Sequence, residues 1–265
     1  MDTVISKDGT KIAFDRSGDG PAVILVDGAF GHRRFGPNEP LAPLLADRFT
    51  VYTYDRRGRG DSGDTAPYAV EREIEDLQAL VATAGGPVLL YGISSGAALA
   101  LAAAAHGLPV RKLALFEAPF VVDGSRPPIP PDYLARMDEL VAADRRGDVV
   151  RLFMGTGVGL PGFVVFMMRL MPAWSKLKQV AHTAPYDAMV LGDTGAGKPL
   201  PADRWAAVTM PALVLSGEKS QAWIRTAMRQ LADLLPEARL QVLPKQTHIV
   251  KPAVLAPALI DFFQE

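Results

Sequence analysis

Continuous apolar runs alternate with helix-like stretches along most of the chain. The runs occupy six segments, at 22–26, 49–54, 87–91, 112–116, 212–216 and 239–243. Unbroken apolar runs of this kind are typical of strands that are covered on both faces. Stretches of helical character separate them, and these lie at 71–84, 95–106, 221–235 and 252–263. The alternation of strand and helix predicts an α/β fold with helices flanking a parallel sheet.

The N-terminal residues follow a different pattern. Residues 3–5 and 10–14 flank the sequence Lys7-Asp8-Gly9, and an Asp-Gly pair between two strand-like segments indicates a hairpin. The chain is therefore expected to begin with an antiparallel pair of strands. Added to the six apolar runs, this pair predicts a mostly parallel, eight-stranded sheet.

A long segment in the second half of the chain contains no strand-like run. It carries helical stretches at 132–145 and 163–171 and several proline-rich turns. Unstructured connections rarely exceed about 12–15 residues, so we interpret residues 120–202 as a helical lid. The core would then comprise residues 1–119 and 203–265. We expect the lid at the carboxyl edge of the sheet, where open α/β folds place their ligand crevice.

Composition narrows the classes of partner. Hydrophobic residues make up 49% of the 265 residues, charged residues make up 22%, and the formal net charge is −1. Such a balance gives no electrostatic reason to bind nucleic acid or an anionic membrane, so we expect a small-molecule substrate; the sequence leaves a homodimer open. The absence of cysteine excludes disulfides and thiolate chemistry. Because the N-terminus also lacks a signal-like apolar run, we expect a cytoplasmic protein.

One motif has the context that nucleophilic catalysis requires. The run 87–91 leads into Gly92-Ile93-Ser94-Ser95-Gly96, and an alanine-rich helical stretch follows. A Gly-x-Ser-x-Gly sequence between a strand and a helix places its serine on a tight, strained turn at the sheet edge. The alternative is a simple Gly/Ser loop, but the flanking elements favour Ser94 as a nucleophile.

A serine hydroxyl needs a neighbouring base to remove its proton. His248 follows the last strand-like run, which is the position that this arrangement requires. His106 ends the helix after the serine motif, His182 falls in the lid and His32 lies in an early loop, so we predict His248 as the base and leave substrate contact open for His32 and His182. The four histidines lack metal-ligand spacing, and we expect neither a metal nor another cofactor.

Two backbone amides are candidates for an oxyanion hole. One belongs to Ser95, the residue after the nucleophile, and the second is expected in the loop after 22–26. That loop reads Asp27-Gly28-Ala29-Phe30-Gly31, which makes Ala29 the second candidate. A plain glycine turn is equally compatible with these letters.

These motifs, taken together, resemble the α/β-hydrolase superfamily, and the chain looks most similar to small bacterial esterase-like members with a helical cap. The loop Asp55 to Ser62, Asp-Arg-Arg-Gly-Arg-Gly-Asp-Ser, and the strand end at Gly217 also match landmarks of that superfamily. Two positions depart from it. Asp27 stands where the resemblance implies a histidine, and Ser220 stands where it implies the acid of a catalytic triad.

Glu117 is the best candidate for the missing acid. It directly follows the run 112–116, and the resemblance to haloalkane dehalogenases of the same superfamily implies a triad acid after this strand. We expect one of its carboxylate oxygens about 3 Å from the inner ring nitrogen of His248. Glu218, Asp193 and Asp123 lack comparable anchoring. The alternative is a Ser–His dyad in which Glu117 only caps a loop or pairs with an arginine.

Several residues around the site are candidates for substrate contact. Asp27 and Phe30 lie in the oxyanion loop, and the lid contributes four methionines, Met154, Met167, Met168 and Met171. These methionines either pack the lid or form a pliable apolar wall for a substrate. We predict that the glycine-flanked segment 159–171 covers the Ser94 pocket and moves on binding.

The sequence supports three hypotheses about function. The first is a serine hydrolase that cleaves a carboxylic ester, lactone or thioester of a small, largely apolar substrate through an acyl-enzyme on Ser94. The second is a specialised enzyme of the same fold, such as a cyclase, lyase, C–C hydrolase or perhydrolase, which Asp27 would favour. The third is a ligand-sensing binding protein.

Overall fold

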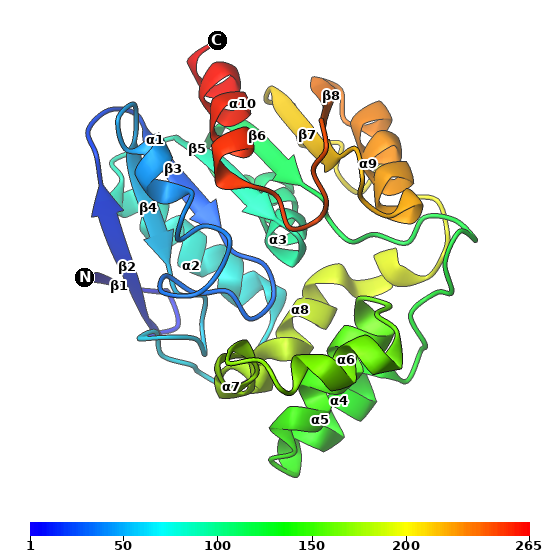
Figure 1. The fold of residues 1–265 in the computed structure, drawn as a ribbon. Coiled ribbons are helices and arrows are strands. Elements are labelled where there is room, and N and C mark those ends of the chain that lie inside the picture. Colours follow the sequence, from blue (N-terminus) through cyan, green and yellow to red (C-terminus); the bar gives the residue numbers. More distant parts are fainter.

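Eight strands form one sheet in the order β1-β2-β4-β3-β5-β6-β7-β8 (Figure 1). The computed structural model describes residues 1–265. Strands β1 and β2 are antiparallel, β2 is antiparallel to β4, and every other pair is parallel. The predicted eight-stranded, mostly parallel sheet is therefore confirmed. The strands are β1 (Asp2–Ile5), β2 (Lys11–Ser17), β3 (Ala22–Val26), β4 (Thr50–Tyr54), β5 (Val88–Ile93), β6 (Val110–Phe116), β7 (Ala212–Gly217) and β8 (Ala238–Leu243).

Helices cover both faces of the sheet. One face packs against α2 (Val70–Thr83), α3 (Ser95–Ala105) and α9 (Ala222–Leu234), and the other packs against α1 (Ala42–Leu45) and α10 (Pro252–Gln264). Short α1 has no counterpart among the elements expected from the sequence, because four residues carry no periodic signal.

Strand β5 shows why the central strands read as unbroken apolar runs. Val88 and Leu90 point into one hydrophobic core, whereas Leu89 and Tyr91 point into the other. All four side chains are buried, since successive side chains of a strand point to opposite faces and helices cover both. The strand thus lies at the centre of the molecule, with its carboxyl end at the serine motif.

The segment between β6 and β7 is helical. Its main helices are α4 (Tyr133–Ala142), α5 (Arg146–Leu152), α6 (Gly162–Met168), α7 (Ala173–Gln179) and α8 (Ala184–Leu191), with a π-helical turn, η1 (Phe153–Gly157), after α5 and short 3₁₀ turns, η2 (Ala181–Thr183) and η3 (Gly192–Gly195), on either side of α8. These helices share a hydrophobic core of their own. The two ends of the predicted lid, 120–202, do not join this core. Phe120, Val122 and Leu200 pack into the core of the sheet instead.

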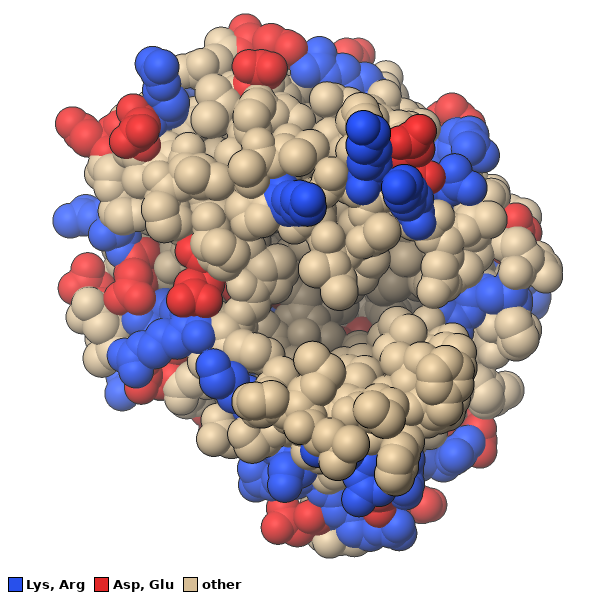
Figure 2. All heavy atoms as spheres, in the orientation of Figure 1, with Lys and Arg blue, Asp and Glu red and all other residues tan.

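A hollow separates the helices of the lid from the rest of the molecule (Figure 2). In the same orientation, the carboxyl ends of the parallel strands face this hollow from above and α6 lies below it (Figure 1). Uncharged residues predominate around the opening (Figure 2). Helix α8 bridges the two sides, since it packs against both α3 and α4. No helix of the structure is both long enough and apolar enough to cross a bilayer.

Candidate active site

Ser94 lies on the sharp turn that joins β5 to α3. Its backbone has φ 58° and ψ −130°, a conformation that costs a non-glycine residue about 1–3 kcal/mol. The backbone N–H of Ser94 donates a hydrogen bond of 2.8 Å to the carbonyl of Phe116. Neighbouring β6 thus fixes the turn, and the serine side chain remains only partly buried.

Three glycines allow the chain to close around this turn. A Cβ atom on Gly92 would lie 2.3 Å from the carbonyl oxygen of Gly96, and one on Gly96 would lie 2.4 Å from that of Val26. A Cβ atom on Gly28 would lie 2.9 Å from the Cβ atom of Ser94. Because these distances leave no room for a side chain, the serine motif packs directly on the end of β3 and on the loop that follows it.

The structure brings Glu117 and His248 together. Nδ1 of His248 lies 2.8 Å from Oε2 of Glu117, at the distance expected from the sequence. The other oxygen, Oε1, accepts a 2.7 Å hydrogen bond from the backbone N–H of Gly217. Glu117 is fully buried and has a positive φ of 49°, so both of its carboxylate oxygens are held where the strands β6 and β7 end.

Ser220 does not take the place of the acid. Its hydroxyl is buried without a hydrogen-bond partner, whereas the imidazole of His248 meets the Glu117 carboxylate. The His248 side chain is 40% exposed, and no hydrogen bond joins it to the Ser94 hydroxyl. Such contacts are often long in the absence of substrate. The catalytic roles of Ser94, His248 and Glu117 stay predictions.

The loop predicted to carry one amide of an oxyanion hole, called the oxyanion loop below, follows β3. The backbone N–H of Ala29 donates no hydrogen bond within the chain, so it is available to a ligand. Phe30 has a positive φ of 61° and is only 2% exposed. Its ring packs edge-on against Phe153 of the lid, with 4.9 Å between the ring centres. Phe30 therefore belongs to the hydrophobic core of the lid, and the expected substrate contact would require it to move.

Asp27 is buried at the start of this loop. The residue is 2% exposed, and its carboxylate lies close to Gly31 and Gly36. Oδ1 has no hydrogen-bond partner. Burial raises the pKa of Asp27 to about 7, although Arg59 and Arg56 act in the opposite direction. The carboxylate lies against the backbone of the loop, and the expected contact of Asp27 with substrate stays a prediction.

A buried ionic network underlies the site, and sequence reasoning missed it. Arg56 pairs with Glu73 at 2.6 Å and with Asp187 at 2.7 Å, and Arg59 pairs with Asp187 at 2.7 Å. All four side chains are at most 1% exposed. The arginines belong to the loop that resembles a superfamily landmark, but Asp187 lies more than a hundred residues further along, on α8. No local pattern connects the two segments.

The four lid methionines divide into two pairs. Met154 and Met168 pack against the hydrophobic core of the lid, as the packing alternative requires. Met167 and Met171 are 54% and 56% exposed. Helix α6, which carries Met167 and Met168, packs mainly against η1, and the covering role of the segment 159–171 stays a prediction.

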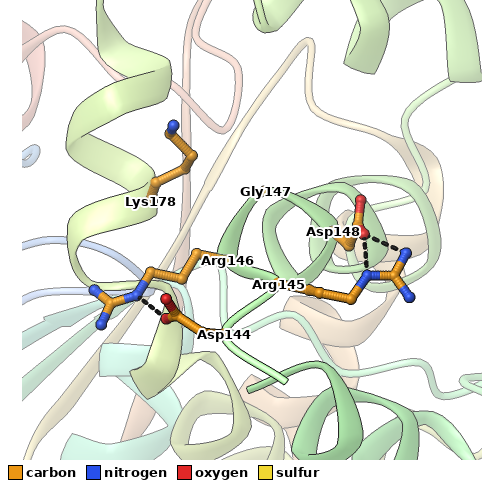
Figure 3. A pocket seen from close by; sticks show the side chains of 6 residues that line it. All are labelled: Asp144, Arg145, Arg146, Gly147, Asp148 and Lys178. Carbon is orange, nitrogen blue, oxygen red and sulfur yellow. Dashed lines mark hydrogen bonds and ion pairs between the residues drawn. The ribbon is translucent and has the colours of Figure 1, made fainter. Parts of the chain in front are cut away.

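His106 and a group of charged residues on the lid lie outside this arrangement. The ring of His106 contacts the carbonyl of Ala102 at 2.8 Å, as expected of a histidine that ends a helix. No cluster of three or more histidine, aspartate or glutamate side chains has a metal-holding arrangement. A separate surface pocket of about 360 Å³ on the lid is lined by charged residues and one glycine, namely Asp144, Arg145, Arg146, Gly147, Asp148 and Lys178 (Figure 3). Its aspartates pair with neighbouring arginines, and none of the three predicted catalytic residues lines it.

Comparison with known proteins agrees with the observed fold. The family model described as "Alpha/beta hydrolase family" matches residues 23–258. The crystal structure of an alpha/beta hydrolase from Sphaerobacter thermophilus DSM 20745 has 54% sequence identity and a TM-score of 0.92, and the match covers 99% of this chain and 100% of that one. A thermophilic esterase from Thermogutta terrifontis shares the fold at 23% identity, with a TM-score of 0.66 and coverage of 99% and 97%.

Curated relatives match over a shorter region. An uncharacterized hydrolase of Bacillus subtilis (strain 168), YraK, is 36% identical over 98 residues, which are 35% of this chain and 35% of that protein. This chain thus matches only about a third of that relative's length. The family model, by contrast, spans most of the chain and includes the serine motif, Glu117 and His248. The protein therefore belongs to the alpha/beta hydrolase family.

Proposed function

We propose that this protein is a serine hydrolase that cleaves a carboxylic ester, lactone or thioester of a small, largely apolar substrate. The observation that carries the proposal is the 2.8 Å contact between buried Glu117 and His248, in a structure whose strained turn presents Ser94 at the same sheet edge. A carboxylate against Nδ1 fixes the tautomer in which Nε2 is free to accept a proton.

The chemistry follows from these positions. Nε2 of His248 removes the proton of the Ser94 hydroxyl as Oγ attacks the substrate carbonyl carbon. The amides of Ala29 and Ser95 stabilise the oxyanion that forms. His248 then donates its proton to the departing alcohol or thiol, and the acyl group remains on Ser94. A water molecule attacks this acyl-enzyme with His248 again as base, which releases the acid and restores the serine.

The surroundings favour an apolar substrate. Uncharged residues predominate around the hollow between lid and core (Figure 2), and α6 exposes Phe163, Phe166 and Met167. The structurally similar esterase lends support to an ester as substrate. The buried position of Asp27 gives the alternative of a specialised reaction no substrate contact to rest on, so ester hydrolysis is the better supported reaction.

Hydrolysis of p-nitrophenyl butyrate and labelling by a fluorophosphonate test the proposal. The wild-type protein should hydrolyse the ester and be labelled at Ser94, and Ser94→Ala should lose about 10⁴-fold or more in kcat and all labelling. Ser220→Ala is the matched control, because its hydroxyl is buried near the site but makes no hydrogen bond; it should retain both. Full ester hydrolysis by purified Ser94→Ala would refute the proposal.

A further inference from the structure

Asp187 of the lid reaches into the core beside the serine motif. It lies on α8 and is fully buried. Oδ1 accepts a 2.8 Å hydrogen bond from the Ser95 hydroxyl and one of 2.7 Å from Arg56, and Oδ2 accepts one of 2.7 Å from Arg59. One lid carboxylate therefore contacts the residue after the nucleophile and the buried arginines together.

Arg59 extends this contact to the other side of the oxyanion hole. Its Nη1 donates a 2.7 Å hydrogen bond to the carbonyl of Gly28. That carbonyl and the N–H of Ala29 belong to the same peptide unit. Because the C=O and N–H of a trans peptide point in opposite directions, holding the Gly28 oxygen fixes the direction of the Ala29 N–H. A hydrogen bond to the carbonyl also polarises the peptide and strengthens its N–H as a donor.

The charges of the network suit this task. Burial raises the pKa of Asp187, but Arg59 and Arg56 outweigh it, so the pKa lies below its ordinary value and the carboxylate is charged. Glu73 supplies the second negative charge, opposite Arg56. Two buried cations are thus matched by two buried anions, and Arg59 would lose its only carboxylate partner without Asp187.

We propose that Asp187 is a positioning residue, through which the lid orients both amide donors of the oxyanion hole. It orients the Ser95 amide through its hydrogen bond with the Ser95 hydroxyl, and the Ala29 amide through Arg59. This inference rests on the proposed function. Asp187 itself contacts neither nucleophile nor base in the structure, and it acts by orienting groups that do contact the substrate. Activity would then depend on the docking of α8 against the core as well as on the residues of the triad.

Two variants and a control on the same helix test the proposal. Asp187→Asn keeps the shape but removes the charge, and Ser95→Ala removes one hydrogen bond while leaving the ion pairs and the Ser95 amide in place. Tyr186→Phe is the control, because the Tyr186 hydroxyl joins the lid to Asp64 of the core without touching the network. The Phe ring can keep the stacking of Tyr186 on Tyr68.

The expected result is a selective loss of transition-state stabilisation. Asp187→Asn should lower kcat about 10- to 100-fold and Ser95→Ala about 3- to 10-fold, with KM for p-nitrophenyl butyrate nearly unchanged. Affinity for a trifluoromethyl ketone, which forms an oxyanion on attack by Ser94, should fall by the same factors. Tyr186→Phe should leave kcat, KM and the affinity for the ketone unchanged. If Asp187→Asn does not fold, Ser95→Ala still decides the outcome.

Amide hydrogen exchange provides a reading that does not depend on turnover. Exchange of the segment 27–36 should accelerate in Asp187→Asn but not in Tyr186→Phe, because only the first releases Arg59 from the loop. A wild-type protein that neither hydrolyses esters nor labels at Ser94 would refute the proposed function, while exchange would still test the positioning. Wild-type kcat and ketone affinity in Ser95→Ala, or unchanged exchange in folded Asp187→Asn, would refute the role of Asp187.

Discussion

Ser94 and Glu117 share an uncommon backbone feature. Each has a positive φ, 58° and 49° respectively, and each follows a buried strand directly. Hydrogen bonds from their backbone N–H groups hold them, from Ser94 to Phe116 and from Glu117 to Leu215. Strained conformations persist where the surrounding structure determines them strongly. At the residue scale, neighbouring strands therefore hold both side chains at one edge of the sheet.

Replacing Glu117 by Gln tests its place in the triad. Glutamine can donate to Nδ1 and favour the wrong tautomer of His248, so kcat for an activated ester should fall about 10²- to 10⁴-fold. Steady-state kinetics measure the effect, and circular dichroism verifies the fold. Glu218→Gln is the matched control, because Glu218 accepts a hydrogen bond from the Lys245 backbone at the surface. Equal activity of the two variants would leave the enzyme as a Ser–His dyad.

The raised pKa of Asp27 predicts that the stability of the protein depends on pH. Its pKa is raised from 3.8 to about 7 in the folded protein by burial, so the folded state keeps a proton that the unfolded chain releases. The free energy of unfolding should therefore fall as pH rises from about 4 to about 7.

Asp27→Asn removes this titration. The variant should gain stability relative to the wild type as pH increases, by about 3 kcal/mol between pH 5 and pH 8. Urea unfolding at pH 5 and pH 8 measures the difference. An equal difference between the two proteins at both pH values would contradict the prediction.

At the element scale, the serine motif depends on close approach between segments. Helix α3 begins where the end of β3 leaves no room for a side chain on Gly96, and the following loop carries Ala29. The sequence predicted the positions of the strands and of the helices flanking the sheet well, because burial on both faces or on one face leaves a clear hydrophobic pattern. The run 239–243 is an exception in its burial, because β8 is an edge strand in which only Leu243 is buried. Glu117 was expected beside His248 because it follows a strand that ends at the carboxyl edge of the sheet and because the resemblance to haloalkane dehalogenases implies an acid there, and the 2.8 Å contact agrees with this expectation.

The remaining features have no local signal. Helix α1 is too short to show a period, and the hydrogen bond between Asp187 and Ser95 joins residues 92 positions apart. The positive φ of Glu117 depends on β7, because its N–H donates to Leu215. The inward orientation of Phe30 likewise depends on Phe153 of the lid. Such features arise from tertiary contacts, which composition and periodicity do not encode.

Gly96→Ala tests the close approach at the start of α3. Its Cβ atom would lie 2.4 Å from the oxygen of Val26 and 2.5 Å from that of Asp27. Backbone atoms cannot rotate away, so the turn must shift, at a cost of about 1–3 kcal/mol and most of the activity. Thermal unfolding and ester hydrolysis measure both effects. Gly124→Ala, where no atom lies within 4 Å, should change neither, and wild-type behaviour of Gly96→Ala would refute the prediction.

At the scale of the whole molecule, two hydrophobic clusters lie against the sheet and a third lies mainly among the inserted helices, although Phe30 of the core joins the third cluster. Helix α8 packs against both the core of the sheet and the cluster of the inserted helices and carries the buried charge of Asp187, whereas α6 is attached mainly to η1 and exposes apolar side chains. This contrast favours movement of α6 with α8 held in place. Exposed apolar side chains beside a hollow are suited to contact with substrate.

Phe163 and Phe166 are 72% and 57% exposed on α6, which makes their contribution to substrate choice testable. A Phe163→Ser, Phe166→Ser double variant should raise KM for p-nitrophenyl octanoate about 10-fold and leave KM for the acetate nearly unchanged. Its melting temperature should stay close to that of the wild type, because exposed side chains contribute little to packing. Leu44→Ser on α1, which replaces a residue that is 43% exposed, is the control. Equal KM changes for both esters would contradict a role of α6 in substrate length.

The buried charges of Arg56 and Arg59 restrict how the inserted helices could be exchanged between related proteins. Arg56 and Arg59 come from the sheet domain, but one of the two anions that neutralise them, Asp187, comes from the inserted helices. A core grafted with the insertion of a relative that lacks a carboxylate here would bury an uncompensated positive charge, which is strongly destabilising. Recombination within the family, in the laboratory or in evolution, would therefore have to transfer the arginines and this aspartate as a unit.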